Sequence, residues 1–260
     1  MGIEHDASGP PPGTEGERWT RTALERLRGR RYTPQAWARF IAESTRRSIA
    51  DLERRPDLAR RAFAIAAAGG APWLAARKGR ALAWWTTVGA MLVTHVGMVE
   101  GPAGERRSGL GAANWITLGR AWLVPAILRA RDRRVFSGLA ALAFATDALD
   151  GAIARGRDEE TRLGAQMDHA VDAVLTISVV ASARRRGWLP GWVAALAIGR
   201  YVVPVGFVTT YYFARAQAPP RDRFIPGRAA GVLVATGLVA AAAGYRRPAV
   251  GLVVSGAGWG

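Results

Sequence analysis

Long uncharged runs alternate with short arginine-rich segments through most of this chain, and this alternation limits the folds open to it. The uncharged runs cover residues 81–99, 121–128, 135–146, 173–183, 187–199, 201–214, 229–245 and 248–260. Arginine-rich segments at 129–134, 184–186, 215–228 and 246–247 separate the later runs. A soluble domain would scatter its charges along amphipathic elements, whereas this pattern is typical of membrane helices. The sequence therefore predicts an all-α fold, a polytopic membrane helix bundle.

Several of these runs are shorter than the ~20 apolar residues that a spanning helix needs. They can span only if their helices extend through polar residues into a protected, water-accessible cavity. Six tryptophans lie near the ends of segments, where an aromatic belt would place them, although a packed core would also accommodate tryptophan: Trp84, Trp85, Trp115, Trp122, Trp188 and Trp192. Small residues in every run permit close contacts between helices, within one chain or between two copies in a homodimer, and the sequence leaves this choice open.

Charge and composition narrow the choice of partners. The chain carries a formal net charge of +16, yet half of its residues are hydrophobic. Nucleic-acid binding is not expected, because the sequence shows no zinc-ligand spacing, aromatic RNA-binding motif or basic-region heptads. Arginines flanking apolar segments also suit an anionic lipid surface, so membrane lipids are the expected partners. The absence of cysteine excludes disulfides, thiol catalysis and thiolate metal sites.

The chain divides into four regions. Residues 1–18 hold a Gly-Pro-rich stretch at 9–13 and are expected to form a flexible tail without the features of a signal peptide. Residues 19–80 form a basic amphipathic helical region, either a membrane-surface anchor or a solvated helical pair. Residues 81–111 are an additional apolar segment and linker, which either spans the membrane or forms a re-entrant or surface helix. Residues 112–260 form the main membrane domain.

Four carboxylates interrupt the apolar pattern near the middle of this domain. Asp147 and Asp150 lie at the end of one predicted helix, and Asp168 and Asp172 lie at the start of the next. Residues three or four apart share a helix face, so each pair projects together. A turn at 156–162 would fold the two helices back antiparallel and bring all four carboxylates together.

Such a cluster near a low-dielectric interior must share protons or bind cations. Carboxylate oxygens are hard ligands that suit Mg²⁺ or Mn²⁺, which often bridge protein carboxylates and substrate phosphates. Gly151 allows a nucleotide to approach closely, and Arg155 offers a planar donor fork for phosphate. An alternative is a solvated helix-turn-helix whose acids pair with neighbouring arginines.

The spacing D-x2-D-G-x2-A-R-x8-G-x3-D-x3-D, from Asp147 to Asp172, resembles the signature of the CDP-alcohol phosphatidyltransferase family, and every fixed position is filled. The segment from Asn114 through Thr117 to Arg120 is similar to the polar start of that family's first core helix. The resemblance covers the front half of a six-helix core that would run from about residue 112 to the end.

The resemblance implies a reaction and a set of site residues. A phosphatidyl group would pass from CDP-diacylglycerol to an alcohol acceptor, and CMP would leave. Asp172 would be the general base, and a metal pair, Mg²⁺ or Mn²⁺, would be held by Asp147, Asp150, Asp168 and Asp172. The CDP-lipid would be bound by Asn114, Thr117, Gly151, Ala154, Arg155 and Thr161. The family's active site opens toward the cytosol, which implies an integral protein of a bacterial-type plasma membrane with the 156–162 turn on the cytoplasmic side.

The acceptor is open at this stage. Arg200 interrupts two uncharged runs and Arg228 begins another, so both could line the cavity and bind a phosphate on the acceptor, which favours glycerol 3-phosphate or inositol phosphate. The alternative for each is a helix-end arginine that reaches to the interface. Ala173 departs from the more basic residue of many family members that use glycerol phosphate. Two other functions remain, a membrane transporter and an inactive scaffold, each using the acids for ion binding.

Overall fold

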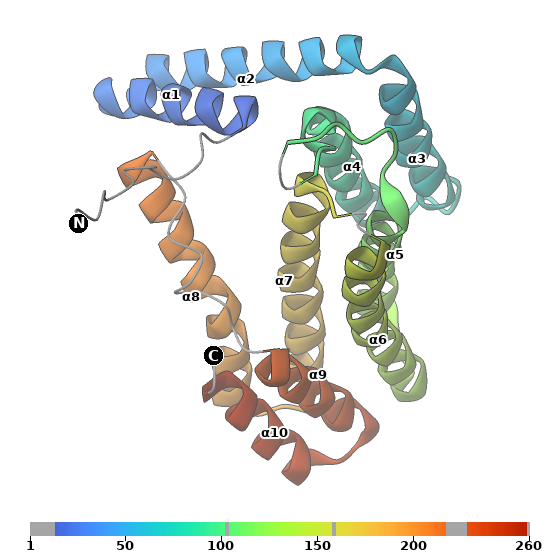
Figure 1. Ribbon diagram of the computed structural model, residues 1–260. Coiled ribbons are helices and arrows are strands. Elements are labelled where there is room, and N and C mark those ends of the chain that lie inside the picture. The colour runs from blue at the N-terminus through green and yellow to red at the C-terminus, as the bar shows by residue number, and fades with distance from the viewer. Residues whose placement is uncertain (1–13, 102–103, 158–159, 217–227, 259–260) are drawn as a thin grey trace, which may run out of the picture.

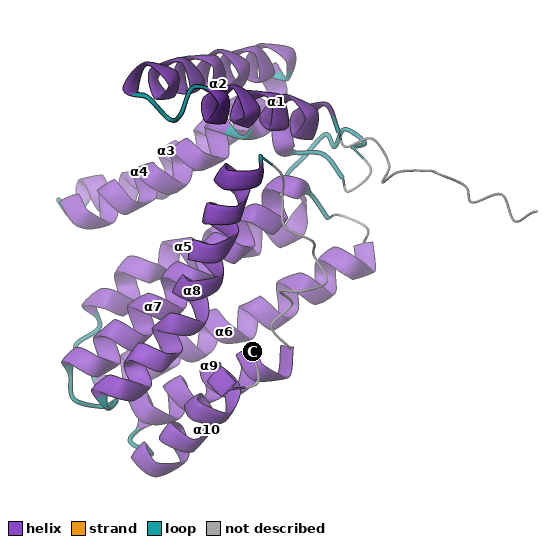
Figure 2. Ribbon diagram, turned by 90° about the vertical axis from the view of Figure 1, so that its left-hand side faces the viewer, coloured by secondary structure: helices purple, strands orange, loops and turns teal. Residues whose placement is uncertain are grey.

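The computed structural model describes residues 14–101, 104–157, 160–216 and 228–258, apart from the side chains of 148–157 and 228–229. The described part is almost entirely helical, and its only pairing of extended backbone is an isolated bridge between Glu100 and Arg106. The predicted all-α class is therefore confirmed. Figure 1 shows upright helices with one pair of helices lying across the upper end and a shorter pair at the lower end, and Figure 2 shows the molecule turned by 90°.

Six helices follow one another in the second half of the chain, as the sequence predicted. They are α5 (Gly111–Arg129), α6 (Arg133–Arg157), α7 (Arg162–Arg185), α8 (Gly191–Arg215), α9 (Arg228–Ala243) and α10 (Arg246–Gly258). Helix α5 packs against both α6 and α7, and α9 packs against α10. One buried cluster joins all six helices through residues such as Ile127, Phe136 and Leu175. This core fixes the orientation of the helices that carry the predicted acids.

Helices α9 and α10 form a short pair at the lower end of the bundle in Figure 1. Their 16 and 13 residues correspond to about 24 Å and about 20 Å of helix. The two helices approach closely because Gly237 and Gly256 lack side chains: a Cβ on Gly237 would meet the carbonyl oxygen of Ala249 at 2.9 Å. The last helix begins at Arg246, two residues before the apolar run that predicted it.

Two further helices, α3 (Pro56–Ala75) and α4 (Gly79–Thr94), form an antiparallel hairpin against α5. Indole N–H groups hold it in place: Trp85 donates to Ala66 O at 2.7 Å, Trp84 to Ala121 O at 2.8 Å, and Trp122 to Gly69 O at 3.1 Å. Trp85 is only 4% exposed. Its placement in an aromatic belt was therefore wrong, and the packed-core alternative holds for this residue.

The first two helices, α1 (Glu15–Gly29) and α2 (Pro34–Arg54), lie across the upper end of the bundle in both views. Thr14 caps α1 in a capping box with Glu17, so the helix begins within the stretch that was expected to be a flexible tail. Buried residues on α1 are confined to Ala23, Leu24 and Leu27, and most of its arginines face outward. The pair is amphipathic, with apolar side chains on one face and charged side chains on the other.

Among the described residues, α8 is the one helix that is long and apolar enough to cross a membrane by itself, and the apolar stretch Ala230–Ala243 is shorter. Helices α5, α6 and α7 do not meet that standard, and each carries charged residues. That these helices cross a membrane stays a prediction.

Candidate active site

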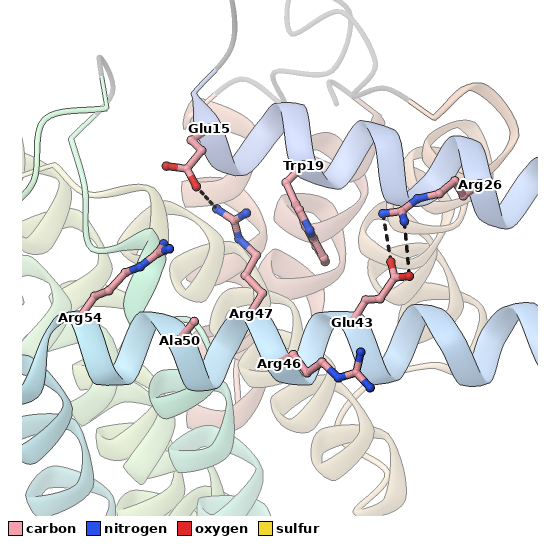
Figure 3. Close-up of a pocket in the computed structure, with 8 residues that line it drawn as sticks. All are labelled: Glu15, Trp19, Arg26, Glu43, Arg46, Arg47, Ala50 and Arg54. Atoms are coloured by element: carbon pink, nitrogen blue, oxygen red, sulfur yellow. Dashed lines mark hydrogen bonds and ion pairs between the residues drawn. The ribbon is translucent and has the colours of Figure 1, made fainter.

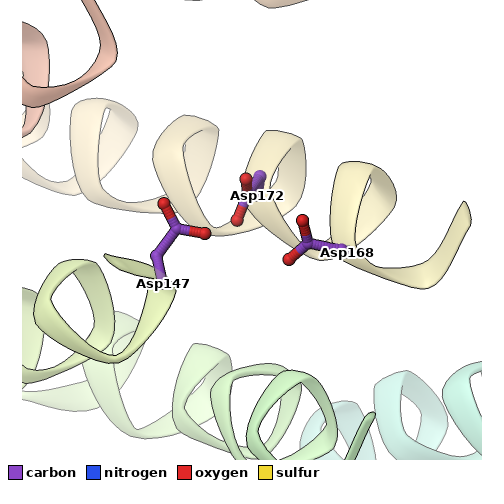
Figure 4. Close-up of side chains that lie close together, drawn as sticks. All are labelled: Asp147, Asp168 and Asp172. Carbon is purple, nitrogen blue, oxygen red and sulfur yellow. The ribbon is translucent and has the colours of Figure 1, made fainter. Parts of the chain in front are cut away.

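Three of the four predicted carboxylates meet between two helices. Asp147 comes from α6, while Asp168 and Asp172 lie one turn apart on α7. Each offers an oxygen, and these oxygens all lie within 4.8 Å of one another. Figure 4 shows the Asp147 side chain directed toward the two side chains from α7. Asp150 lies on the same helix as Asp147, but its side chain is outside the described residues.

The guanidinium of Arg120 lies at the centre of this cluster. Arg120 comes from α5 and is 2% exposed. Its Nη2 lies 2.9 Å from Asp147 Oδ1, its Nη1 lies 2.7 Å from Asp168 Oδ1, and it also forms an ion pair with Asp172. A buried guanidinium persists only where opposite charge surrounds it. The cluster therefore forms a pocket of negative potential that stabilises positive charge.

The donor set fits a divalent cation. Three partly exposed carboxylates converge from two helices, and hard oxygen ligands of this kind are those that Mg²⁺ and Mn²⁺ prefer. Arg120 already offsets part of the negative charge through ion pairs with all three carboxylates. A bound metal would share them with the guanidinium or displace it.

A second group of polar residues orients the start of α7. Thr161 caps this helix, its hydroxyl oxygen accepting from Gly164 N at 3.0 Å and from Asn114 Nδ2 at 2.9 Å. Asn114 also donates to the carbonyl of Leu110, and both Asn114 and Thr161 are buried. Thr117 is buried one turn further along α5 and donates to Ala113 O at 3.2 Å. These bonds attach the first core helix to the turn before Asp168 and Asp172.

Gly164 makes this attachment possible. A Cβ at this position would collide with Asn114 Oδ1 and would lie 2.9 Å from Thr161 Oγ1. Neither side chain has room to withdraw, because both are buried and hydrogen-bonded to each other. The glycine of the signature is therefore required by close helix packing at the site.

The remaining predicted residues divide into two groups. Gly151, Ala154 and Arg155 lie on α6, and Arg228 begins α9, but the side chains at these positions are outside the described residues. Arg200 on α8 donates from Nη1 to Gly256 O on α10 at 2.8 Å. This bond holds two core helices together, and none of the described contacts joins Arg200 to the carboxylates.

Sequence reasoning assigned no role to Arg120. A signal was available, because Asn114, Thr117 and Arg120 recur every three residues and so follow one side of α5. An arginine within an apolar helix is a functional candidate by default. That argument was applied to Arg200 and Arg228, yet it fits Arg120 better.

A separate hollow lies between α1 and α2 (Figure 3). Its lining includes Trp19 and four arginines, two of which pair with glutamates: Arg26 with Glu43 at 3.0 Å and Arg47 with Glu15 at 3.4 Å. None of its lining residues belongs to the carboxylate cluster. We take the carboxylate cluster as the candidate active site, because its three side chains occupy signature positions and converge on one point.

The fold and the site together define an all-α helical bundle with a carboxylate cluster of the kind that can hold a divalent cation. The family model for CDP-alcohol phosphatidyltransferase matches residues 110–259, which is more than half of the chain. The chain therefore belongs to the CDP-alcohol phosphatidyltransferase family, membrane-associated transferases of substituted phosphate groups. The chain matches no curated protein and no solved structure.

Proposed function

We propose that this enzyme transfers the phosphatidyl group of CDP-diacylglycerol to a hydroxyl of a phosphorylated polyol, such as glycerol 3-phosphate or inositol phosphate, and releases CMP. Family membership supports phosphatidyl transfer from a CDP-alcohol. The observation that carries the proposal is the convergence of Asp147, Asp168 and Asp172, which occupy signature positions, into one cluster. The lipid donor and the acceptor class are the parts that need testing.

In the proposed reaction, Asp172 accepts the proton of the acceptor hydroxyl. The acceptor oxygen forms a bond to the phosphorus nearest the lipid, and the bond from that phosphorus to the oxygen of CMP breaks. Asp147, Asp150, Asp168 and Asp172 would hold Mg²⁺ or Mn²⁺, which supplies positive charge against the phosphates. Asn114, Thr117, Gly151, Ala154, Arg155 and Thr161 are proposed to bind the CDP-lipid.

The acceptor assignment rests on two arginines. A guanidinium has five N–H donors, so the bond from Arg200 to the α10 backbone leaves donors for a phosphate. Arg228 stands at the first position of α9, where the helix dipole also favours an anion. We propose that the two bind the acceptor's phosphate, which favours a phosphorylated polyol over a plain amino alcohol.

The proposed location is a bacterial-type plasma membrane with the carboxylate end toward the cytoplasm. The support is the family resemblance, which implies an active site that opens toward the cytosol. Charge bias does not add to this support, because arginines gather at both ends of the bundle. We also propose that two copies can associate through helices rich in small residues.

The test is release of CMP from CDP-diacylglycerol by detergent-purified protein with Mg²⁺. The acceptor panel contains glycerol 3-phosphate, inositol phosphate, inositol, serine and phosphatidylglycerol. We expect release with one phosphorylated polyol, and a loss of roughly 100-fold or more in Asp172→Asn because the general base is removed. Release with serine or inositol alone would overturn the acceptor assignment. Release with no acceptor, despite CDP-lipid binding, would favour an inactive scaffold.

A further inference from the structure

Three loops are joined at the end of the bundle that lies away from the carboxylates. Arg186 donates to Ala130 O, Arg133 donates to Ala241 O at 2.8 Å, and Arg246 donates to Gly187 O at 3.0 Å. These bonds connect the α5–α6, α7–α8 and α9–α10 loops in turn. Residues 128–135, 183–188 and 244–248 therefore form one continuous surface, which we name the arginine end.

The arginine end is strongly basic. It holds nine arginines and a single acid, Asp132. The Asp132 carboxylate is already engaged, because it accepts a hydrogen bond from Val135 N at 2.9 Å at the start of α6. Most of the arginines are exposed, including Arg131, Arg134 and Arg185. So much positive charge on one small surface is a strong attractor for anions.

Two pairs of these arginines stand where a helix disfavours positive charge. Arg133 and Arg134 occupy the first turn of α6, and Arg246 and Arg247 occupy the first turn of α10, and neither turn contains an acid. The helix dipole is positive at an N-terminus, so it repels a guanidinium and favours an anion. An external anion would offset this repulsion at both helix ends.

Apolar and aromatic side chains border the arginine end. Tyr245 is 66% exposed, and Leu128 and Val135 are also exposed. Trp188 lies beside two guanidiniums, with Arg133 Cζ 4.8 Å and Arg186 Cζ 5.2 Å from its ring centroid. A surface that mixes arginines with exposed aromatic and aliphatic groups is suited to the headgroup level of a bilayer rather than to a nucleic-acid duplex.

We propose that the arginine end binds the phosphate groups of anionic phospholipids, in the leaflet opposite the catalytic carboxylates. The proposal rests on the membrane location proposed above and goes beyond the transfer reaction, since none of these residues belongs to the active site. Arg133 and Arg186 hold the loops together, while the outward-facing arginines contact the lipid phosphates. Bound anionic lipid thereby stabilises three of the loops that connect the core helices.

The experiment measures thermal unfolding of the detergent-purified chain in mixed micelles containing phosphatidylglycerol or phosphatidylcholine. The test variant changes Arg131, Arg134, Arg184 and Arg185 to Gln, which spares the arginines that bond the loops together. A matched control changes the same four to Lys and keeps the charge. We expect phosphatidylglycerol to raise Tm in the unmodified chain and in the Lys control. The Gln variant should lose most of that shift and bind phosphatidylglycerol at least about tenfold more weakly.

An equal Tm shift with phosphatidylcholine, or a full phosphatidylglycerol shift in the Gln variant, would overturn the proposal. A short DNA duplex is included as a competitor, and displacement of lipid by DNA at physiological salt would indicate a nucleic-acid surface instead. CMP release is measured on the same samples. Absence of the phosphatidylglycerol effect in the unmodified chain, with CMP release intact, would count against this proposal alone, so this outcome is distinguishable from failure of the proposed reaction.

Discussion

Arg120 is a buried cation among carboxylates that are proposed to hold a metal. The guanidinium offsets their mutual repulsion, and its removal would leave three like charges within a few ångströms of one another. Breaking a buried ion pair is costly because the partner charge stays behind. We therefore expect Arg120 to stabilise the metal-free protein. A metal would have to compete with its guanidinium for the same carboxylates.

Replacing Arg120 by Gln tests this role. We expect the variant to lose about 1–3 kcal/mol of stability without metal, less than a fully buried pair would cost, because the carboxylates are partly exposed. Mg²⁺ should restore that loss, so its effect on Tm should be larger in the variant than in the unmodified chain. Arg200→Gln is the control, since its bond is to a backbone carbonyl. An equal Mg²⁺ effect in all three proteins would contradict the prediction.

Gly164 tests the packing of the helix start against α5. The substitution Gly164→Ala should destabilise the protein by about 1–3 kcal/mol, because the added methyl group overlaps a hydrogen-bonded pair that has no room to move. Gly119→Ala on α5 is the matched control. No atom outside its own helix lies within 4 Å of a Cβ there, so a gain of up to about 1 kcal/mol is expected. Thermal unfolding of both variants decides; the prediction fails if they behave alike.

Sequence reasoning succeeded for the placement of residues that share one face of a helix. The pairing of Asp168 with Asp172 follows from helical periodicity, and Asp147 joined them as predicted. It did not predict the position of Arg120 or the bond between Asn114 and Thr161, because both depend on how α5 packs against α7. Residues 48 positions apart in sequence are brought together by tertiary packing, which spacing within a single helix does not encode.

Helix α1 connects two core helices at the catalytic end. At its start, Arg162 of α7 lies 2.6 Å from Glu17 and donates to Thr14 Oγ1 at 3.0 Å. Just beyond its far end, Tyr32 donates to Phe213 O of α8 at 2.7 Å. Arg162 follows Thr161 directly, so its contact with α1 helps to hold the turn that is proposed to bind the CDP-lipid.

Breaking the contact between Arg162 and Glu17 should therefore affect substrate binding. In Arg162→Gln we expect KM for CDP-diacylglycerol to rise roughly 2–5-fold, the range set by a partly exposed ion pair, with a smaller change in kcat. Arg26→Gln breaks a comparable pair between α1 and α2 and serves as the control. The charge-reversed double variant, Glu17→Arg with Arg162→Glu, should recover part of the loss. An unchanged KM in Arg162→Gln would refute the role.

The positions of the helices were easier to predict in the six-helix core than in the residues that precede it. Uncharged runs separated by arginines marked the positions of the core helices, although the two runs at 187–199 and 201–214 form the single helix α8, which continues through Arg200. Helix α3 was grouped with the basic region, since Arg60 and Arg61 lie near its start, yet it pairs with α4. The pairing depends on Gly69, where a Cβ would collide with the Trp85 ring. A single apolar segment at 81–99 gave no sign of such a partner.

At the scale of the whole molecule, the absence of cysteine allows a direct test of topology. Single cysteines placed at Arg46 on α2, at Lys78 in the α3–α4 turn and at Arg131 would be the only thiols in each variant. With the proposed orientation, a membrane-impermeant thiol reagent added to intact cells should label Lys78→Cys and Arg131→Cys but leave Arg46→Cys unlabelled until the cells are opened. Labelling of Arg46→Cys in intact cells would show that the orientation is the reverse of the proposed one. If Lys78→Cys alone failed to react, the hairpin would be re-entrant rather than spanning.

The α3–α4 hairpin leaves and returns to the same end of the bundle. Two antiparallel helices add an even number of crossings, or none, so they leave the parity of the remaining helices unchanged. A chain could gain or lose this hairpin without turning its catalytic carboxylates to the other side of the membrane. A single extra helix would invert the entire core. Because the addition is a pair of helices, the N-terminal region and the start of the six-helix core stay on the same side of the membrane.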